Sequence, residues 1–262
     1  MSASASVPAS TGGPAQPAPP LGPPLTERGT VRHEQVLSQR WALQGIAKVV
    51  GEVTIGSGRL VGTVIVGGGV AAGELTLIGS LESRGSVVVA GRLHVRGSLD
   101  VAGGARSGQA DLEGPVQVGK ELQVDGRLRV RGSLRAPDVR CAAFELRGSA
   151  AVPGSITATS FDAHLVSDSR LGSVRCREFR LRGPAPNVVR RVLGGDPLVT
   201  VERVEADTAR IESARVQFVR AREIVLGRGA HVVAIEGRLV RAHPSSRLGP
   251  ESWSRPPEGL RR

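Results

Sequence analysis

Large aromatic side chains are almost absent from this sequence. Phenylalanine, tryptophan and tyrosine make up 2% of the 262 residues, and tyrosine does not occur. The cores of ordinary sandwiches and α/β domains depend on such side chains, because each buries a large apolar area. A thin core of valine, leucine, isoleucine and alanine suits this composition better.

Cysteine is also scarce, and the spacing of its two copies does not indicate a bridge. Cys141 and Cys176 lie far apart, at positions that we expect to face inward. They are predicted to be small buried apolar side chains in a protein of a reducing compartment. None of the five histidines has the spacing of metal ligands, so we expect no metal ion and no cofactor.

No apolar run approaches the roughly 20 residues of a membrane-spanning helix. The first residues, MSASASVPAS, have neither the basic nor the apolar region of a secretion signal. We therefore expect a cytoplasmic protein, with peripheral contact to the inner face of the membrane as an open alternative.

Positive charge is plentiful and comes almost entirely from arginine. The formal net charge is +11, and Lys48 and Lys120 are the only lysines. A solvated basic surface is the simplest interpretation, and attraction to anionic lipid, nucleic acid or cell-wall polymer is the functional one. Because the basic stretches lack aromatic residues that stack on bases, we expect no specific nucleic-acid binding.

What the sequence does contain is a glycine at every sixth position near its middle. The register holds at Gly73, Gly79, Gly85, Gly91, Gly97 and Gly103. The third and fifth positions of each hexad are apolar and alternate with polar residues, so they share one face of a short strand. A fixed short period over many copies indicates a solenoid, with each hexad forming one side of a coil.

Two near-copies predict the number of sides. GRLHVRGSLDVA begins at Gly91 and GRLRVRGSLRAP at Gly126, 35 residues later, which is close to two coils of three hexads. We therefore expect three sides per coil. The predicted core residues are Leu75, Leu77, Val87, Val89, Leu93, Val95, Leu99 and Val101.

After Arg135 the apolar pattern shortens to a period of five. Val204/Ala206, Ala209/Ile211, Ala214/Val216 and Val219/Ala221 show it most clearly. The predicted fold class is all-β, a single-stranded β-solenoid with hexad and then pentad repeats between disordered termini. A helix over 204–222 is the alternative for the pentads.

These patterns divide the chain into seven segments. They are a disordered Pro/Ala/Ser-rich tail (1–30), an N-terminal cap or short helix (31–44), a hexad β-helix (45–137), a pentad β-helix (138–182), a loop or flap (183–198), a pentad β-helix with closing strands (199–241) and a disordered basic tail (242–262).

Hexad solenoids also occur in hexapeptide acyltransferases, which use a histidine as general base. That alternative predicts a trimer with a cleft between subunits and an essential His94. However, His94 stands between Leu93 and Val95 and should face solvent, and no paired carboxylates or Ser/His/Asp set accompany it. We therefore expect a protein that is not an enzyme.

The two ends of the solenoid are then the predicted surface for self-assembly, because end strands expose unpaired backbone groups. The candidates are Ile46, Val49 and Val53 at the first coil, and Ile224, Leu226, Val233 and Ile235 at the last. Candidates for contact with a polyanion or membrane are Arg127, Arg129, Arg131, Arg135, Arg255, Arg261 and Arg262.

The GRLHVRGSLDVAG-type hexads, flanked by a Pro-rich head and a short tail, resemble the bactofilins, the polymer-forming cytoskeletal proteins of bacteria. The resemblance implies a right-handed, roughly triangular β-helix and end-to-end filaments that need no nucleotide. It also implies the chain itself as partner, with the inner membrane face and cell-wall or morphogenesis proteins as further partners. The pentad segment departs from the family's uniform domain and leaves an alternative open: a monomeric, capped solenoid that binds an acidic polymer or a membrane surface.

Overall fold

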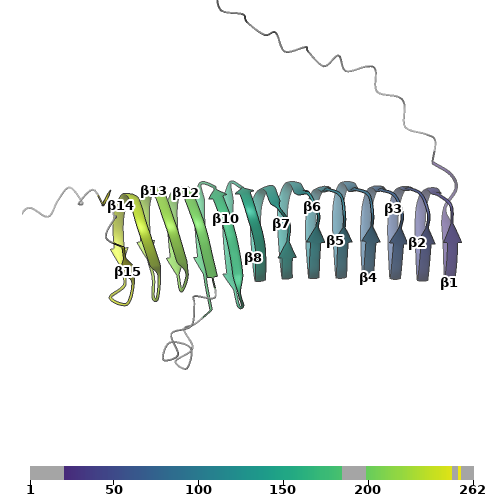
Figure 1. The fold of residues 1–262 in the computed structure, drawn as a ribbon. Coiled ribbons are helices and arrows are strands. Elements are labelled where there is room, and N and C mark those ends of the chain that lie inside the picture. The colour runs from purple at the N-terminus through teal and green to yellow at the C-terminus, as the bar shows by residue number, and fades with distance from the viewer. Residues whose placement is uncertain (1–20, 185–198, 250–252, 255–262) are drawn as a thin grey trace, which may run out of the picture.

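In the computed structural model the chain forms one long parallel β-sheet wound into a solenoid, which confirms the predicted fold class (Figure 1). The structure describes residues 21–184, 199–249 and 253–254. The strands are β1 (Leu25–His33), β2 (Val36–Val49), β3 (Val53–Val66), β4 (Val70–Ser83), β5 (Val87–Val101), β6 (Ala105–Val118), β7 (Glu121–Arg135), β8 (Asp138–Thr157), β9 (Ser160–Leu165), β10 (Ser169–Arg175), β11 (Glu178–Arg182), β12 (Val199–Glu212), β13 (Arg215–Leu226), β14 (His231–Ala242), β15 (Arg247–Leu248) and β16 (Trp253–Ser254).

Each turn pairs in parallel with the turns before and after it. Val53 of β3 pairs with Val70 of β4, which pairs with Val87 of β5, so that valine stacks on valine every 17 residues. The two near-copies of the sequence lie two turns apart, because Leu93 pairs with Ala110 and Ala110 with Leu128. The hydrogen bonds that hold the strands therefore join residues distant in sequence.

Every hexad turn has three inward-facing pairs of side chains, as the spacing predicts. In β5 they are Val87/Val89, Leu93/Val95 and Leu99/Val101, and each of the six is at most 1% exposed. The eight predicted core residues are all buried, and the apolar core is continuous from Val36 to Ile235. Burial of this column should dominate stability, at about 25 cal/mol per Å² of apolar area.

Of the three corners of a hexad turn such as β5, only one has a glycine with a left-handed backbone. Gly79 and Gly97 have φ angles of 130° and 132°, and they stack at the same corner of successive turns. A Cβ at Gly97 would overlap the carbonyl oxygen of Gly79, so both the conformation and the space require glycine. Gly85 and Gly91 lie at the other two corners and keep ordinary φ angles.

In the second half of the solenoid the turn becomes shorter. Val201 pairs with Val216 and Ala209 with Ile224, each 15 residues later, which corresponds to three pentads. The helix alternative for 204–222 is wrong, since β12 and β13 cover this stretch. Before the change in turn length, Phe144, Phe161 and Phe179 stack along the core with ring centroids 4.9 Å apart.

The structure corrects the predicted N-terminal boundary. Residues 31–44, predicted as a cap or short helix, belong to β1 and β2, and the described part of the 1–30 tail contains most of β1. Leu37 and Trp41 have the i, i+4 spacing of a helical face, but Trp41 is buried and Leu37 is exposed. Val36, Trp41 and Leu43 face inward from two sides of one turn. Pairing with β3 satisfies their backbone, so the strand forms despite the weak alternation.

The C-terminal boundary also differs. The predicted closing strands form one strand, β14, and the predicted basic tail contains β15 and β16, which pair with it. The predicted flap at 183–198 lies outside the described residues, apart from 183–184, as do 1–20, 250–252 and 255–262.

Candidate functional site

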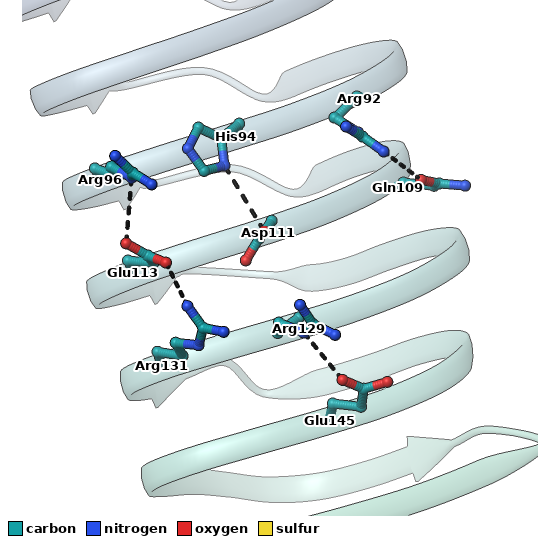
Figure 2. Close-up of polar contacts among 9 residues, drawn as sticks. All are labelled: Arg92, His94, Arg96, Gln109, Asp111, Glu113, Arg129, Arg131 and Glu145. Atoms are coloured by element: carbon teal, nitrogen blue, oxygen red, sulfur yellow. Dashed lines mark hydrogen bonds and ion pairs between the residues drawn. The ribbon is translucent and has the colours of Figure 1, made fainter.

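Charged side chains cover one side of four successive turns, β5 to β8, and we name this surface the charged face (Figure 2). Its residues point outward because they alternate with the buried pairs Leu93/Val95 and Leu128/Val130. The charged face consists of Arg92, His94, Arg96, Gln109, Asp111, Glu113, Arg127, Arg129, Arg131, Glu145 and Arg147.

Strand register arranges these side chains in rows that are basic on β5 and β7, acidic on β6 and mixed on β8. His94 of β5 lies beside Asp111 of β6, Asp111 beside Arg129 of β7, and Arg129 beside Glu145 of β8. Neighbouring strands of a sheet are about 4.8 Å apart, so an acidic row lies within reach of the basic row on either side.

Two carboxylates each bind two arginines of the face. Glu113 joins Nε of Arg96 at 3.3 Å and Nη1 of Arg131 at 2.7 Å, and so bridges three turns. Glu145 binds Nε of Arg127 at 3.4 Å and accepts a 3.0 Å hydrogen bond from Nε of Arg129. That hydrogen bond raises the pKa of Arg129 above its ordinary value. Figure 2 shows the contacts of Arg96, Arg129 and Arg131 with these two carboxylates.

Basic charge still exceeds acidic charge on this face. Arg92 reaches only the amide oxygen of Gln109, at 3.5 Å, and Arg147 forms no ion pair with any described residue. Six arginines therefore share three carboxylates. The face carries a net positive charge of about three, before any contribution from His94.

The face is hollowed in two places between its rows. One hollow of about 140 Å³ is lined by Arg92, Gln109, Asp111, Arg127 and Arg129. A second, of about 110 Å³, lies beside Arg131, Glu145 and Arg147. Arginine donors and carboxylate acceptors thus border the same depressions.

The structure brings together only part of the predicted basic set. Arg127, Arg129 and Arg131 lie in one row on β7, but Arg135 lies on the next side of the solenoid. There it borders a shallow groove of about 370 Å³ along Ser98, Pro115, Ser133 and Ser149. Arg255, Arg261 and Arg262 lie outside the described residues. The basic set predicted from the sequence does not include Arg92 and Arg147, because only the strand register places them beside β7.

Several predicted end residues are not at an end. Val49 and Val53 are buried in β2 and β3, one turn or more from the N-terminal edge, and Ile46 is an exposed residue of β2. β1 precedes them, so their assignment to the first coil is wrong. At the other end, Ile224 and Leu226 lie in β13, while Val233 and Ile235 lie in the last long strand, β14.

The interior of the first turn combines apolar Leu25 and Val31 with two ionisable side chains, Glu27 and His33. Glu27 faces inward and accepts hydrogen bonds from Nε1 of Trp41 at 2.9 Å and from Nε2 of His33 at 2.9 Å. The His33 ring meets the Trp41 indole edge-on, with centroids 6.4 Å apart. The apolar core is therefore closed at its N-terminal end by a small hydrogen-bonded cluster.

The other chemically reactive residue types form no cluster in the described parts of the chain. Cys141 and Cys176 have free thiols, and burial raises the pKa of both to about 12. His94 lies on the outside of β5, with Nδ1 3.9 Å from Asp111. No group of His, Cys, Asp and Glu suited to a metal ion occurs among the described residues, and none of their segments is a helix able to cross a membrane.

Comparison with family models, with curated proteins and with solved structures found no match to this chain.

Proposed function

We propose that this protein is a non-enzymatic, bactofilin-like scaffold that assembles end to end without nucleotide. A β-solenoid made of stacked repeats is consistent with a structural role, since each turn contacts only its neighbours and further turns can be added at an edge. In the proposed assembly the added turns come from another copy of the chain.

The observation that carries the proposal is the free edge of β1. All nine residues of β1 pair with β2, and no other described strand pairs with β1. Strand edges present backbone N–H and C=O groups that readily pair with another chain. The polar cluster of Glu27, His33 and Trp41 already closes the interior here, so the contact is expected to be made mainly by the backbone edge.

The opposite edge is shorter. β15 pairs with β14 at His231 and Val232, and β16 pairs with it at Glu236 and Gly237. The remaining stretch, 238–242, has no strand on its outer side among the described residues. This stretch is the proposed second contact, and β1 and β14 lie at opposite ends of the molecule (Figure 1).

Electron microscopy of the purified chain in negative stain, at physiological salt and without nucleotide, tests the proposal. Filaments are expected for the wild type. Lysine in place of the exposed Thr26 and Thr30 of β1 should shorten or abolish them, because charged edge residues prevent strand addition. The matched control, T54K/T76K, adds the same charge to the interior strands β3 and β4 and should leave the filaments unchanged.

Uniform single particles of the wild type would contradict the proposal. They would favour the second candidate, a monomeric solenoid whose C-terminal edge is covered by its own β15 and β16. Equal loss of filaments in both lysine variants would show an effect of net charge rather than of the β1 edge.

A further inference from the structure

We propose that the charged face of β5 to β8 binds a linear anionic polysaccharide. This inference concerns a side of the solenoid rather than its ends, and it does not depend on end-to-end assembly. It rests on three features of the face: unmatched arginines, carboxylates placed between them, and the lack of aromatic side chains.

The arginines supply the attraction for an anion. Arg92 and Arg147 have no carboxylate partner among the described residues, and both side chains are exposed. Arg127, Arg129 and Arg131 lie between them in a row, spaced about 7 Å from one another along β7. The arginines thus lie on three of four successive turns, β5, β7 and β8, and this spread suits an extended polymer better than a single small anion.

The arginines are also preorganised. Glu113 contacts one arginine of β5 and one of β7, and Glu145 contacts two arginines of β7, at 2.7–3.4 Å. Side chains that are already positioned lose less conformational entropy when a ligand binds. The two hollows between the rows, of about 140 and 110 Å³, give the polymer a recessed surface.

The acidic row decides which class of polyanion fits. Asp111 and Glu113 lie in the middle of the face, and Asp111 lines the larger hollow together with Gln109. A ligand made only of anionic groups would be repelled there. A polysaccharide carries hydroxyl donors as well, so its hydroxyls can donate to Gln109, Asp111 and Glu145 while its anionic groups meet the arginines.

Two other polyanions fit less well. Single-stranded nucleic acid is held largely by stacking on aromatic side chains, and the charged face has none. An anionic bilayer offers a dense plane of negative headgroups, which the central carboxylates disfavour. Both are outcomes of the test below.

The experiment measures binding of fluorescein-labelled polygalacturonate to the full chain by anisotropy, at about 0.15 M salt. The wild type should bind, and R92Q/R147Q should bind roughly five- to tenfold more weakly through the loss of two exposed ionic contacts. The control R135Q/R170Q makes the same change of charge on the neighbouring side of the solenoid and should bind like the wild type. Circular dichroism confirms that both variants fold.

Three further probes identify the polymer. Polyglutamate carries carboxylates but no hydroxyls and should bind more weakly than polygalacturonate, as should a single-stranded oligonucleotide of equal charge. Vesicles that contain phosphatidylserine should capture little protein.

Four results would overturn the proposal. They are no binding by the wild type even at low salt, equal loss of affinity in both double variants, equal affinity for polyglutamate, or tighter binding to the oligonucleotide or the vesicles.

Discussion

Nε1 of Trp41 donates a 2.9 Å hydrogen bond to Oε2 of Glu27, and this bond joins the second turn of the solenoid to the first. Trp41 is fully buried, whereas Glu27 occupies a position that is apolar in the next turn, where it pairs with Leu43. A carboxylate inside a β-solenoid is costly unless its oxygens are paired. Here the indole of Trp41 and the ring of His33 satisfy it.

Replacement of Glu27 by leucine should lower the free energy of unfolding by about 1–3 kcal/mol. The buried indole N–H would lose its acceptor, and that loss outweighs the added apolar contact. Urea denaturation followed by circular dichroism measures the change. Thr26→Leu, at the exposed neighbouring position, should have little effect, and an equal change in both variants would contradict the role of the Glu27 cluster.

Alanine at Gly97 should destabilise the fold by about 1–3 kcal/mol. Its φ of 132° disfavours any side chain, and a Cβ would meet the carbonyl oxygen of Gly79. Gly104→Ala is the control, because Gly104 has an ordinary φ and its nearest contact would be the Glu121 carbonyl oxygen at 3.3 Å. Thermal unfolding compares the two variants. Equal stability of both would contradict the requirement for glycine at the left-handed corner.

Truncation of Phe161 to alanine should cost about 3–5 kcal/mol, because the ring is buried between two others in the stack. Phe218→Ala removes the same side chain from the surface, where Arg203 lies 5.0 Å from the ring centroid. That loss should be below about 1 kcal/mol. Chemical denaturation of both variants tests whether the stack or mere aromatic content stabilises the chain.

Both cysteine thiols should react slowly in the folded protein. Burial raises the pKa of Cys141 and of Cys176 to about 12, so at pH 8 the thiolate fraction is about a thousandfold smaller than at an ordinary thiol. Alkylation by iodoacetamide should accelerate strongly in guanidinium and, in the folded chain, keep rising with pH above 10. An alkylation rate that levels off near pH 9 would contradict the raised pKa of the buried thiols.

Asp138 should make stability depend on acid pH. The hydroxyl and the backbone N–H of Ser155 both donate to its Oδ1 at 2.7 Å, and they lower the pKa of the carboxyl. Because the unfolded value is about 3.9, the stabilisation is complete above that pH and is lost as the pH falls through the lower folded value.

The variant Asp138→Asn should therefore be less stable than the wild type by about 1 kcal/mol at pH 7. The difference should shrink as the pH falls through the folded pKa of Asp138, because the protonated carboxyl is then neutral like the amide. Asp125→Asn, which alters an exposed carboxylate 3.5 Å from Arg106, is the control. A difference for Asp138→Asn that does not change with pH would contradict the hydrogen-bonding assignment.

Much of the fold could be predicted because the repeat encodes it locally. Alternation alone places Leu93 and Val95 inside and His94 outside, and it also places Arg127, Arg129 and Arg131 on one face. The charged face as a whole could not be predicted. Its members from β5, β6 and β8 join the β7 row only through pairing between residues 16–18 positions apart.

The ends were predicted least well, for a related reason. Residues 31–44 have a weak pattern that is compatible with a helix, and only hydrogen bonds to β3 make them a strand. The same holds for β15 and β16, which are two residues long and exist only beside β14. Local preference is too weak in such segments to determine structure without a partner strand.

By itself, the sequence determined most of the strands, their inward residues and the three-sided turn, because each follows from apolar alternation within glycine-separated hexads and within pentads. Tertiary structure alone decided which corner needs left-handed glycine, which turn is first, and how basic and acidic rows alternate on the charged face. These properties depend on contacts between successive turns, whose register steps vary from 15 to 19 residues and reach 30 between β11 and β12.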